Sequence, residues 1–103
     1  MAKRSIVWTK TANFQLHEVL KYWVIRNKSS RYSKKLLKAV TKRVLQISET
    51  PYIYKLTDYN DVRVSSMGDF SIFYKATDKQ IIIMSFWDNR QDSKKILKLL
   101  RNK

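Results

Sequence analysis

Two spacings of hydrophobic residues follow one another in the first quarter of the chain. β-Branched and aromatic side chains crowd the segment Ser5 to Thr9, which is typical of a short strand. From Thr11 the spacing becomes helical, because hydrophobic residues recur three or four positions apart: Leu16, Val19, Leu20 and Trp23. This pattern predicts an amphipathic helix that runs to about Asn27, with Thr9 or Thr11 as its N-cap.

A second amphipathic helix is predicted after the polar segment Asn27 to Ser30. It starts near Arg31 with Ser29 or Ser30 as its cap, and one face carries a hydrophobic stripe: Leu36, Val40, Val44 and Ile47. Pro51 ends this helix, because the residue before a proline is biased away from helical backbone angles. The two helices are therefore expected to form a hairpin.

The second half of the chain has the spacing of strands. A loop is expected over Pro51 to Asn60, and three extended segments follow it: Val62 to Ser65, Phe70 to Tyr74 and Gln80 to Trp87. Turn-forming residues at Gly68-Asp69 and Thr77-Asp78-Lys79 separate these segments, so we expect successive antiparallel strands. The continuous apolar run of the last strand predicts a central strand that is covered on both faces.

The last element predicted is a helix from Ser93 to about Arg101, with an apolar stripe of Ile96, Leu99 and Leu100. A chain of 103 residues is enough for one core, so we expect a single domain over residues 1–103. The order of elements predicts an α+β fold. In it, an N-terminal strand and a helical hairpin pack on an antiparallel β-sheet, with a C-terminal helix.

The charge of the chain is strongly positive and unevenly spread. Lysine and arginine number 22 against 8 acidic residues, which gives a net charge of +14. No acid lies between Glu18 and Glu49, so we expect the basic face of the second helix to contact phosphate: Lys34, Lys35, Lys38, Lys42 and Arg43. A polyanion or an acidic protein is the kind of partner that such an excess of charge favours.

Several classes of site and location are excluded or disfavoured by composition. The chain has no cysteine and one histidine, His17, so we expect no disulfide, no metal site and no cofactor. The longest apolar stretch, Ile81 to Trp87, is too short to span a bilayer, and the first residues lead into no hydrophobic leader. We therefore expect a soluble protein of the cytoplasm without a membrane partner.

Several motifs together resemble a known family across almost the whole chain. They are Ile6-Val7-Trp8-Thr9 before a helix, Pro51 after the hairpin, Arg63 on a strand, the segment Gly68 to Tyr74, and Phe86-Trp87-Asp88-Asn89-Arg90-Gln91-Asp92. In this combination the chain resembles the RelE/ParE superfamily of bacterial toxins from type II toxin-antitoxin systems.

The resemblance implies a partner and two alternative activities. The partner is an acidic antitoxin that wraps the toxin. The first activity is ribosome-dependent, metal-independent cleavage of mRNA, which would make the chain an endoribonuclease that binds the ribosome. The alternative is the ParE branch, which inhibits DNA gyrase without a nuclease site. Ser71 stands where many nuclease members carry an arginine, which keeps the gyrase alternative open.

The candidate catalytic residues are Arg63, Arg90 and Asp88. Arg90 follows the last strand at the position of the family's active site, and its planar guanidinium can hold a phosphate through two hydrogen bonds. Alternatively, Arg90 pairs with Asp88 or Asp92 to cap the final helix. Arg63 is expected on the same side of its strand as Ser65.

Further contacts to nucleic acid are expected from Lys55, Lys75 and Trp87. Trp87 could stack on a base, although a tryptophan that ends a buried strand also fits a position in the core. Tyr74 is a poor candidate for proton transfer, because it shares a face with Phe70 and Ile72 and is expected in the core.

Overall fold

The computed structural model describes residues 4–91 and 93–101. In this part of the chain the elements are β1 Ser5–Trp8, α1 Lys10–Asn27, α2 Arg31–Glu49, β2 Lys55–Leu56, β3 Arg63–Met67, β4 Phe70–Ala76, β5 Gln80–Asp88 and α3 Ser93–Arg101. The predicted helices, strands and turns are confirmed. One expectation was wrong: the segment after Pro51, expected as a loop, contains β2, which pairs with β3 over two residues.

The strands form one sheet in the order β1-β5-β4-β3-β2. Neighbouring strands from β5 to β2 are antiparallel, which was predicted for β3, β4 and β5. β1 pairs with β5 in parallel, with Ile6 opposite Ile81, so the sheet is mixed. A parallel pair of strands needs a long connection, and the chain between β1 and β5 provides one, because it includes both helices and three further strands. β5 lies between β1 and β4 and is the central strand that its apolar run predicted.

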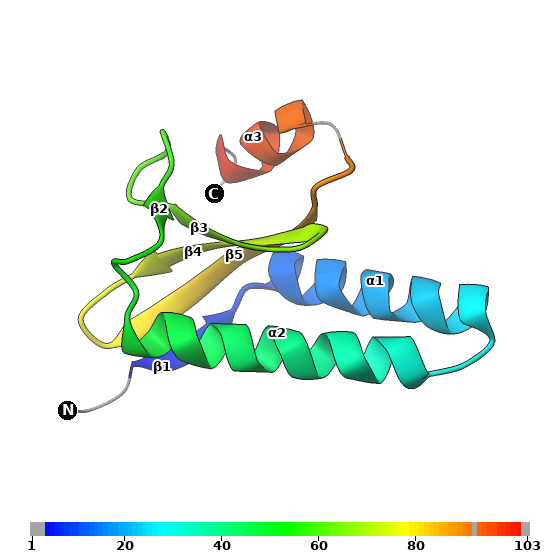
Figure 1. Cartoon of the computed structure of the whole chain (residues 1–103). Helices are drawn as coiled ribbons and strands as arrows, with labels where there is room; N and C mark the ends of the chain where they lie inside the picture. Colours follow the sequence, from blue (N-terminus) through cyan, green and yellow to red (C-terminus); the bar gives the residue numbers. More distant parts are fainter. Residues whose placement is uncertain (1–3, 92, 102–103) are drawn as a thin grey trace.

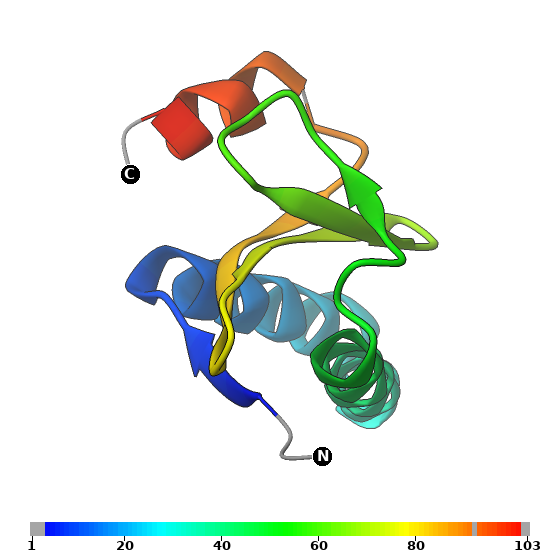
Figure 2. The same cartoon turned by 90° about the vertical axis from the view of Figure 1, so that its left-hand side faces the viewer.

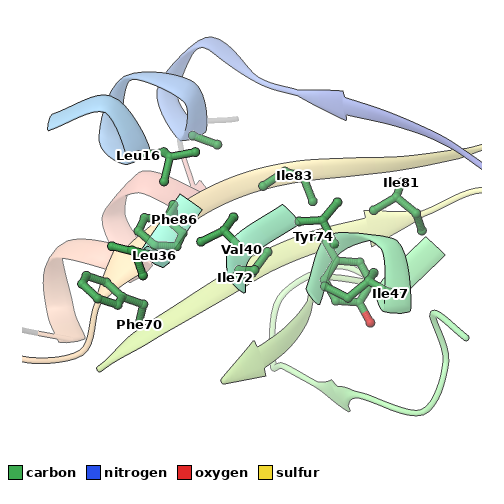
Figure 3. Packing of buried hydrophobic residues seen from close by; sticks show 12 residues of the cluster. Leu16, Leu36, Val40, Ile47, Phe70, Ile72, Tyr74, Ile81, Ile83 and Phe86 are labelled. Carbon is green, nitrogen blue, oxygen red and sulfur yellow. The ribbon is translucent and has the colours of Figure 1, made fainter. Parts of the chain in front are cut away.

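The molecule has three layers, with helices on both faces of the sheet. Figure 1 shows the hairpin of α1 and α2 along one face and α3 over the other, and Figure 2 shows the same layers after a quarter turn. The larger core lies under the hairpin and contains Ala12, Leu16, Leu36, Val40, Val44, Ile47, Phe70, Ile72, Tyr74, Ile81, Ile83 and Phe86 (Figure 3). It contains the four residues of the stripe predicted for the second helix.

A smaller core lies between the sheet and α3, and it contains Val62, Met84, Trp87, Ile96 and Leu100. β5 contributes to both cores because its side chains alternate between the two faces of the sheet, and a β-bulge shifts the phase of this alternation. Phe73 pairs with Ser85 while Tyr74 pairs with Ile83, so one residue of β5 is left unpaired between them. The predicted stripe on the last helix is confirmed for Ile96 and Leu100, while the side chain of Leu99 lies outside the described residues.

Polar side chains fix the helices on the sheet. The Thr9 hydroxyl accepts a hydrogen bond from the Ala12 amide at 3.2 Å and donates to the Ile83 carbonyl at 2.9 Å. Thr9 is therefore the N-cap of α1 and also joins this helix to β5. Ser33 donates to the Leu20 carbonyl at 2.6 Å, which holds α2 against α1. No helix among the described residues has the length and apolar character needed to cross a membrane.

Candidate functional site

Asp88 and Arg90 form a closed pair where β5 ends. The Arg90 Nε donates to Asp88 Oδ1 at 2.9 Å and its Nη2 donates to Oδ2 at 2.7 Å. The Arg90 backbone amide also donates to Oδ1 at 2.9 Å. The carboxylate therefore accepts three hydrogen bonds from one residue, in the bidentate geometry that arginine also uses to hold phosphate.

The pair holds both groups in their charged forms. The side-chain hydrogen bond from Arg90 is the main reason that the pKa of Asp88 lies below its usual value, although partial burial opposes it. The same hydrogen bond raises the pKa of Arg90. The structure thus shows the pairing with Asp88 that was one of the two interpretations of Arg90, while Asp92 lies outside the described residues.

A cleft of about 430 Å³ lies beside this pair, between α1 and the end of β5. Its walls are largely aromatic: Phe14, Tyr22, Trp23, Phe86 and Trp87. Phe14 is 65 % exposed. The charged groups of the lining are two carboxylates, Glu18 and Asp88, and one guanidinium, Arg90, so the local charge disfavours a phosphate. An apolar side chain of another protein fits this lining better.

The aromatic rim of the cleft was missed by the sequence analysis. Phe14 and Tyr22 stand eight residues apart, on the face of α1 that lies away from its buried residues Ala12 and Leu16. Exposed aromatic residues at helical spacing were a usable signal, since such residues are enriched where proteins contact one another.

Arg63 lies at the other end of the sheet, where its guanidinium is hydrogen-bonded to backbone carbonyls of the same chain. Its Nη1 donates to the Tyr54 carbonyl at 2.8 Å and to the Tyr52 carbonyl at 3.3 Å, and its guanidinium lies 5.2 Å from the centre of the Tyr52 ring. Arg63 therefore holds the segment that follows α2. As predicted, it faces the same side as Ser65, whose hydroxyl accepts a hydrogen bond from Arg43 of α2.

Tyr74 lies in the larger core, as predicted, next to Ile47 in Figure 3. Its hydroxyl donates a hydrogen bond to the Pro51 carbonyl. Burial raises the pKa of Tyr74 to about 12, although the nearby Arg63 lowers it in part. The phenol is therefore neutral, and its hydroxyl is engaged by the Pro51 carbonyl within the core.

The three candidate catalytic residues are not brought together. Arg63 is opposite Tyr74 in the sheet, whereas Asp88 is opposite Phe70. These two pairings lie four positions apart on β4, which corresponds to about 13 Å between backbone positions along the strand. Arg63 and Arg90 are each bonded to partners at their own end of the sheet, which keeps the two guanidiniums apart.

The other nucleic-acid candidates are scattered over the molecule. Lys34, Lys35, Lys38 and Lys42 are exposed on α2. Arg43 instead donates to Ser65 and to the Ser66 carbonyl, Lys55 is exposed on β2, and Lys75 is half-buried on β4.

Trp87 and Ser71 are both buried near the end of β5. Trp87 is 6 % exposed and packs with Ile96 and Leu100 of α3, so most of its side chain belongs to the smaller core. Ser71 donates to the Asn89 side chain at 2.7 Å. Among residues 4–91 and 93–101, no three histidine or acidic side chains lie close enough to hold a metal ion.

Comparisons with known proteins identify the family. The structure is similar to the chromosomal ParDE toxin-antitoxin system of P. aeruginosa, with 17 % identity, a TM-score of 0.72, and coverage of 84 % of this chain and 96 % of that one. It is also similar to the RelBE2 toxin-antitoxin complex of Mycobacterium tuberculosis, with 16 % identity, a TM-score of 0.65, and coverage of 88 % and 97 %. At these identities, the two structures show a shared fold. None of the curated proteins matches the chain.

The sequence itself matches the family model described as the ParE toxin of type II toxin-antitoxin system, parDE, over residues 6–93. This match spans most of the chain and agrees with the resemblance in fold and motifs. The chain therefore belongs to the ParE toxin family, within the RelE/ParE superfamily of type II toxins.

Proposed function

We propose that this toxin acts by binding DNA gyrase and that it does not cut nucleic acid. The observation that carries the proposal is the separation of Arg63 from the Asp88–Arg90 pair across the sheet. The match to the ParE family supports the same choice, because the ParE branch is the one for which the resemblance implies gyrase as the target.

Cleavage of RNA through the 2'-hydroxyl needs a group that takes its proton, a group that protonates the leaving oxygen, and positive charge on the phosphate. Asp88 and Arg90 are paired with one another through two side-chain hydrogen bonds. Arg63 donates to two backbone carbonyls, and Tyr74 is neutral in the core. This arrangement supports a mechanism based on binding.

The cleft beside Arg90 offers a binding site of the kind that proteins use. Phe14 and Tyr22 are exposed at its edge, and aromatic residues that enter a partner's pocket often carry much of the binding energy. We propose that the cleft between α1 and the end of β5 contacts gyrase.

The test is a supercoiling assay with purified gyrase, relaxed plasmid and ATP. We expect the wild-type chain to inhibit supercoiling and to leave breaks in the DNA. Phe14→Ser should raise the concentration needed for inhibition about tenfold, the loss expected when one anchoring aromatic residue is removed. Ile53→Ser is the matched control, because Ile53 is as exposed as Phe14 and lies after α2, outside the lining of the cleft.

Unchanged supercoiling in the presence of excess wild-type chain would contradict the proposal. Equal inhibition by the wild type and Phe14→Ser would retain gyrase as the target and would overturn the cleft as its contact.

A further inference from the structure

One side of α1 packs into the larger core, and the opposite side carries a row of exposed residues. We call this row the α1 seam, and it consists of Phe14, Glu18, Lys21 and Ile25. Phe14 and Ile25 are 65 % and 66 % exposed. At about 100° of rotation per residue, Ile25 lies about 180° around the helix from the buried Leu16. The apolar residues of the seam therefore point away from the core of the chain.

The spacing of the α1 seam is that of a coiled coil. Its residues follow one another at intervals of four, three and four, which is the spacing of positions that face a partner helix. The seam is about 16 Å long. It has an apolar residue at each end, Phe14 and Ile25, and two opposite charges in the middle. A second helix is the element that such a line of side chains fits.

The seam is complementary to itself when two copies run in opposite directions. If the centre of the pair lies between Val19 and Leu20, Phe14 of one chain faces Ile25 of the other. In the same register Glu18 faces Lys21, and a two-fold axis repeats both contacts. No basic residue of α1 then faces another basic residue, because Lys10, Lys21 and Arg26 fall opposite Ser29, Glu18 and Asn13.

The two charges of the seam are left without partners by the fold of the chain. Over residues 4–91 and 93–101, neither Glu18 nor Lys21 forms an ion pair or a side-chain hydrogen bond. Glu18 is also the one acid among the first 48 residues of the sequence. It lies at the position where an antiparallel second copy supplies a lysine.

Three other occupants fit the seam less well. Nucleic acid and an acidic protein both bring negative charge, which Glu18 at the middle of the seam repels. The surface of a bilayer takes up a continuous apolar face, whereas Glu18 and Lys21 interrupt this one. Charge complementarity in one register therefore favours a second copy of the chain.

We propose that two copies of this chain pair through their α1 seams, antiparallel and around a two-fold axis. Phe14 packs on Ile25 of the second copy at both ends, and Glu18 pairs with Lys21 of the second copy in the middle. The seam is short and each chain carries a charge of +14, so we expect a reversible dimer with a dissociation constant in the micromolar range.

Pairing would cover Phe14, which the proposed function assigns to gyrase. A paired chain could then not use Phe14 on gyrase, so the single chain would be the form that inhibits. This consequence rests on the proposed function, whereas the pairing itself does not.

The test is analytical ultracentrifugation of the chain alone, from about 1 µM to about 1 mM, which measures the dissociation constant of the dimer. Glu18→Lys and Lys21→Glu each place like charges opposite one another twice, so each should weaken pairing at least tenfold. An equimolar mixture of these two variants restores opposite charges at every facing position. The mixture should therefore pair about as tightly as the wild type.

The matched controls are Glu49→Lys and Lys38→Glu. They change the net charge of the chain by the same amounts at exposed residues of α2, and both should pair as the wild type does. Ile25→Ser should weaken pairing at least tenfold. Because Ile25 is outside the lining of the cleft, this variant should inhibit gyrase as the wild type does at concentrations below the dissociation constant. Circular dichroism melting confirms that each variant folds.

A wild-type chain that stays monomeric up to about 1 mM would overturn the proposal. So would a dimer that is equally stable in the wild type, Glu18→Lys and Lys21→Glu, because pairing would then use another surface. Two variants that stay monomeric when mixed would contradict the register. If the variants behave as expected and the wild type fails to inhibit gyrase, only the proposed function is wrong.

Discussion

The two ends of the sheet use an arginine in different ways. At one end, Arg63 is half-buried and donates to the carbonyls of the segment after α2, beside Tyr74 and the larger core. At the other end, the side chain of Arg90 is 55 % exposed and is paired with one carboxylate. The difference teaches that a sequence motif alone does not make an arginine available to a ligand. Neighbouring groups that accept its hydrogen bonds or neutralise its charge compete with the ligand. At the first end the arginine holds the chain together, and at the second it borders an open cleft.

The largest effect that separates the two ends is expected at Tyr74. Tyr74→Ala removes a fully buried ring and should lower the free energy of unfolding by about 3–5 kcal/mol. Tyr74→Phe keeps the ring but leaves the Pro51 carbonyl without its donor, which should cost about 1–3 kcal/mol. Urea unfolding at pH 7 measures the free energy of unfolding of both variants. A Tyr74→Phe variant as stable as the wild type would show that the hydrogen bond to Pro51 does not stabilise the fold.

A smaller loss of stability is expected at Arg63. Arg63→Ala removes the donors to two carbonyls and should lower the free energy of unfolding by about 1–2 kcal/mol. The control is Lys55→Ala, which alters an exposed residue on the neighbouring strand β2. It should change the free energy of unfolding by less than about 0.5 kcal/mol. If Arg63→Ala kept full stability and lost toxicity, Arg63 would be a ligand contact.

The smallest effect on stability is expected at the exposed pair, where the clearer signal should be a change in pKa. Because the pKa of Asp88 is lowered in the folded chain, the pair contributes stability above the unfolded pKa of about 3.9, and this contribution disappears as the pH falls through the folded pKa. Arg90→Gln should therefore raise the pKa of the Asp88 carboxyl toward its usual value and lower the free energy of unfolding at pH 7 only slightly, because the pair is exposed to solvent.

An NMR titration of the side-chain carboxyl carbons measures this pKa. Arg26→Gln, which removes an exposed arginine of α1, is the control and should leave the titration of Asp88 unchanged. An Asp88 that titrates at its usual value in the wild type would show that the pair does not persist in solution.

Local pattern was enough to predict most of the fold. The stripe from Leu36 to Ile47 predicted α2 and its buried face, and the apolar run of β5 predicted a strand covered on both sides. The parallel pairing of β1 with β5 joins segments about 75 residues apart, and no local pattern encodes it. β2 has two residues, too few to show any period.

The candidate site was harder to predict, because it depends on which neighbour each charge meets. Both interpretations of Arg90 were consistent with the sequence, and the structure shows the pairing with Asp88. The distance between Arg63 and Arg90 depends on the register of β4, which the sequence does not specify. Trp87 also had two interpretations, a base-stacking residue or a core residue. Its packing against α3 places it in the smaller core.

Whether the wild-type chain cuts mRNA is the most direct test of a toxin that acts by binding alone. Translating ribosomes are saturated with the purified chain, and primer extension maps the ends of the transcript, with and without EDTA. We expect full-length transcripts under both conditions, because Arg63 and Asp88 pair with positions of β4 about 13 Å apart along the strand and Arg90 is paired with Asp88. Cuts at defined codons that depend on the ribosome would contradict the binding mechanism and would assign the chain to the nucleases.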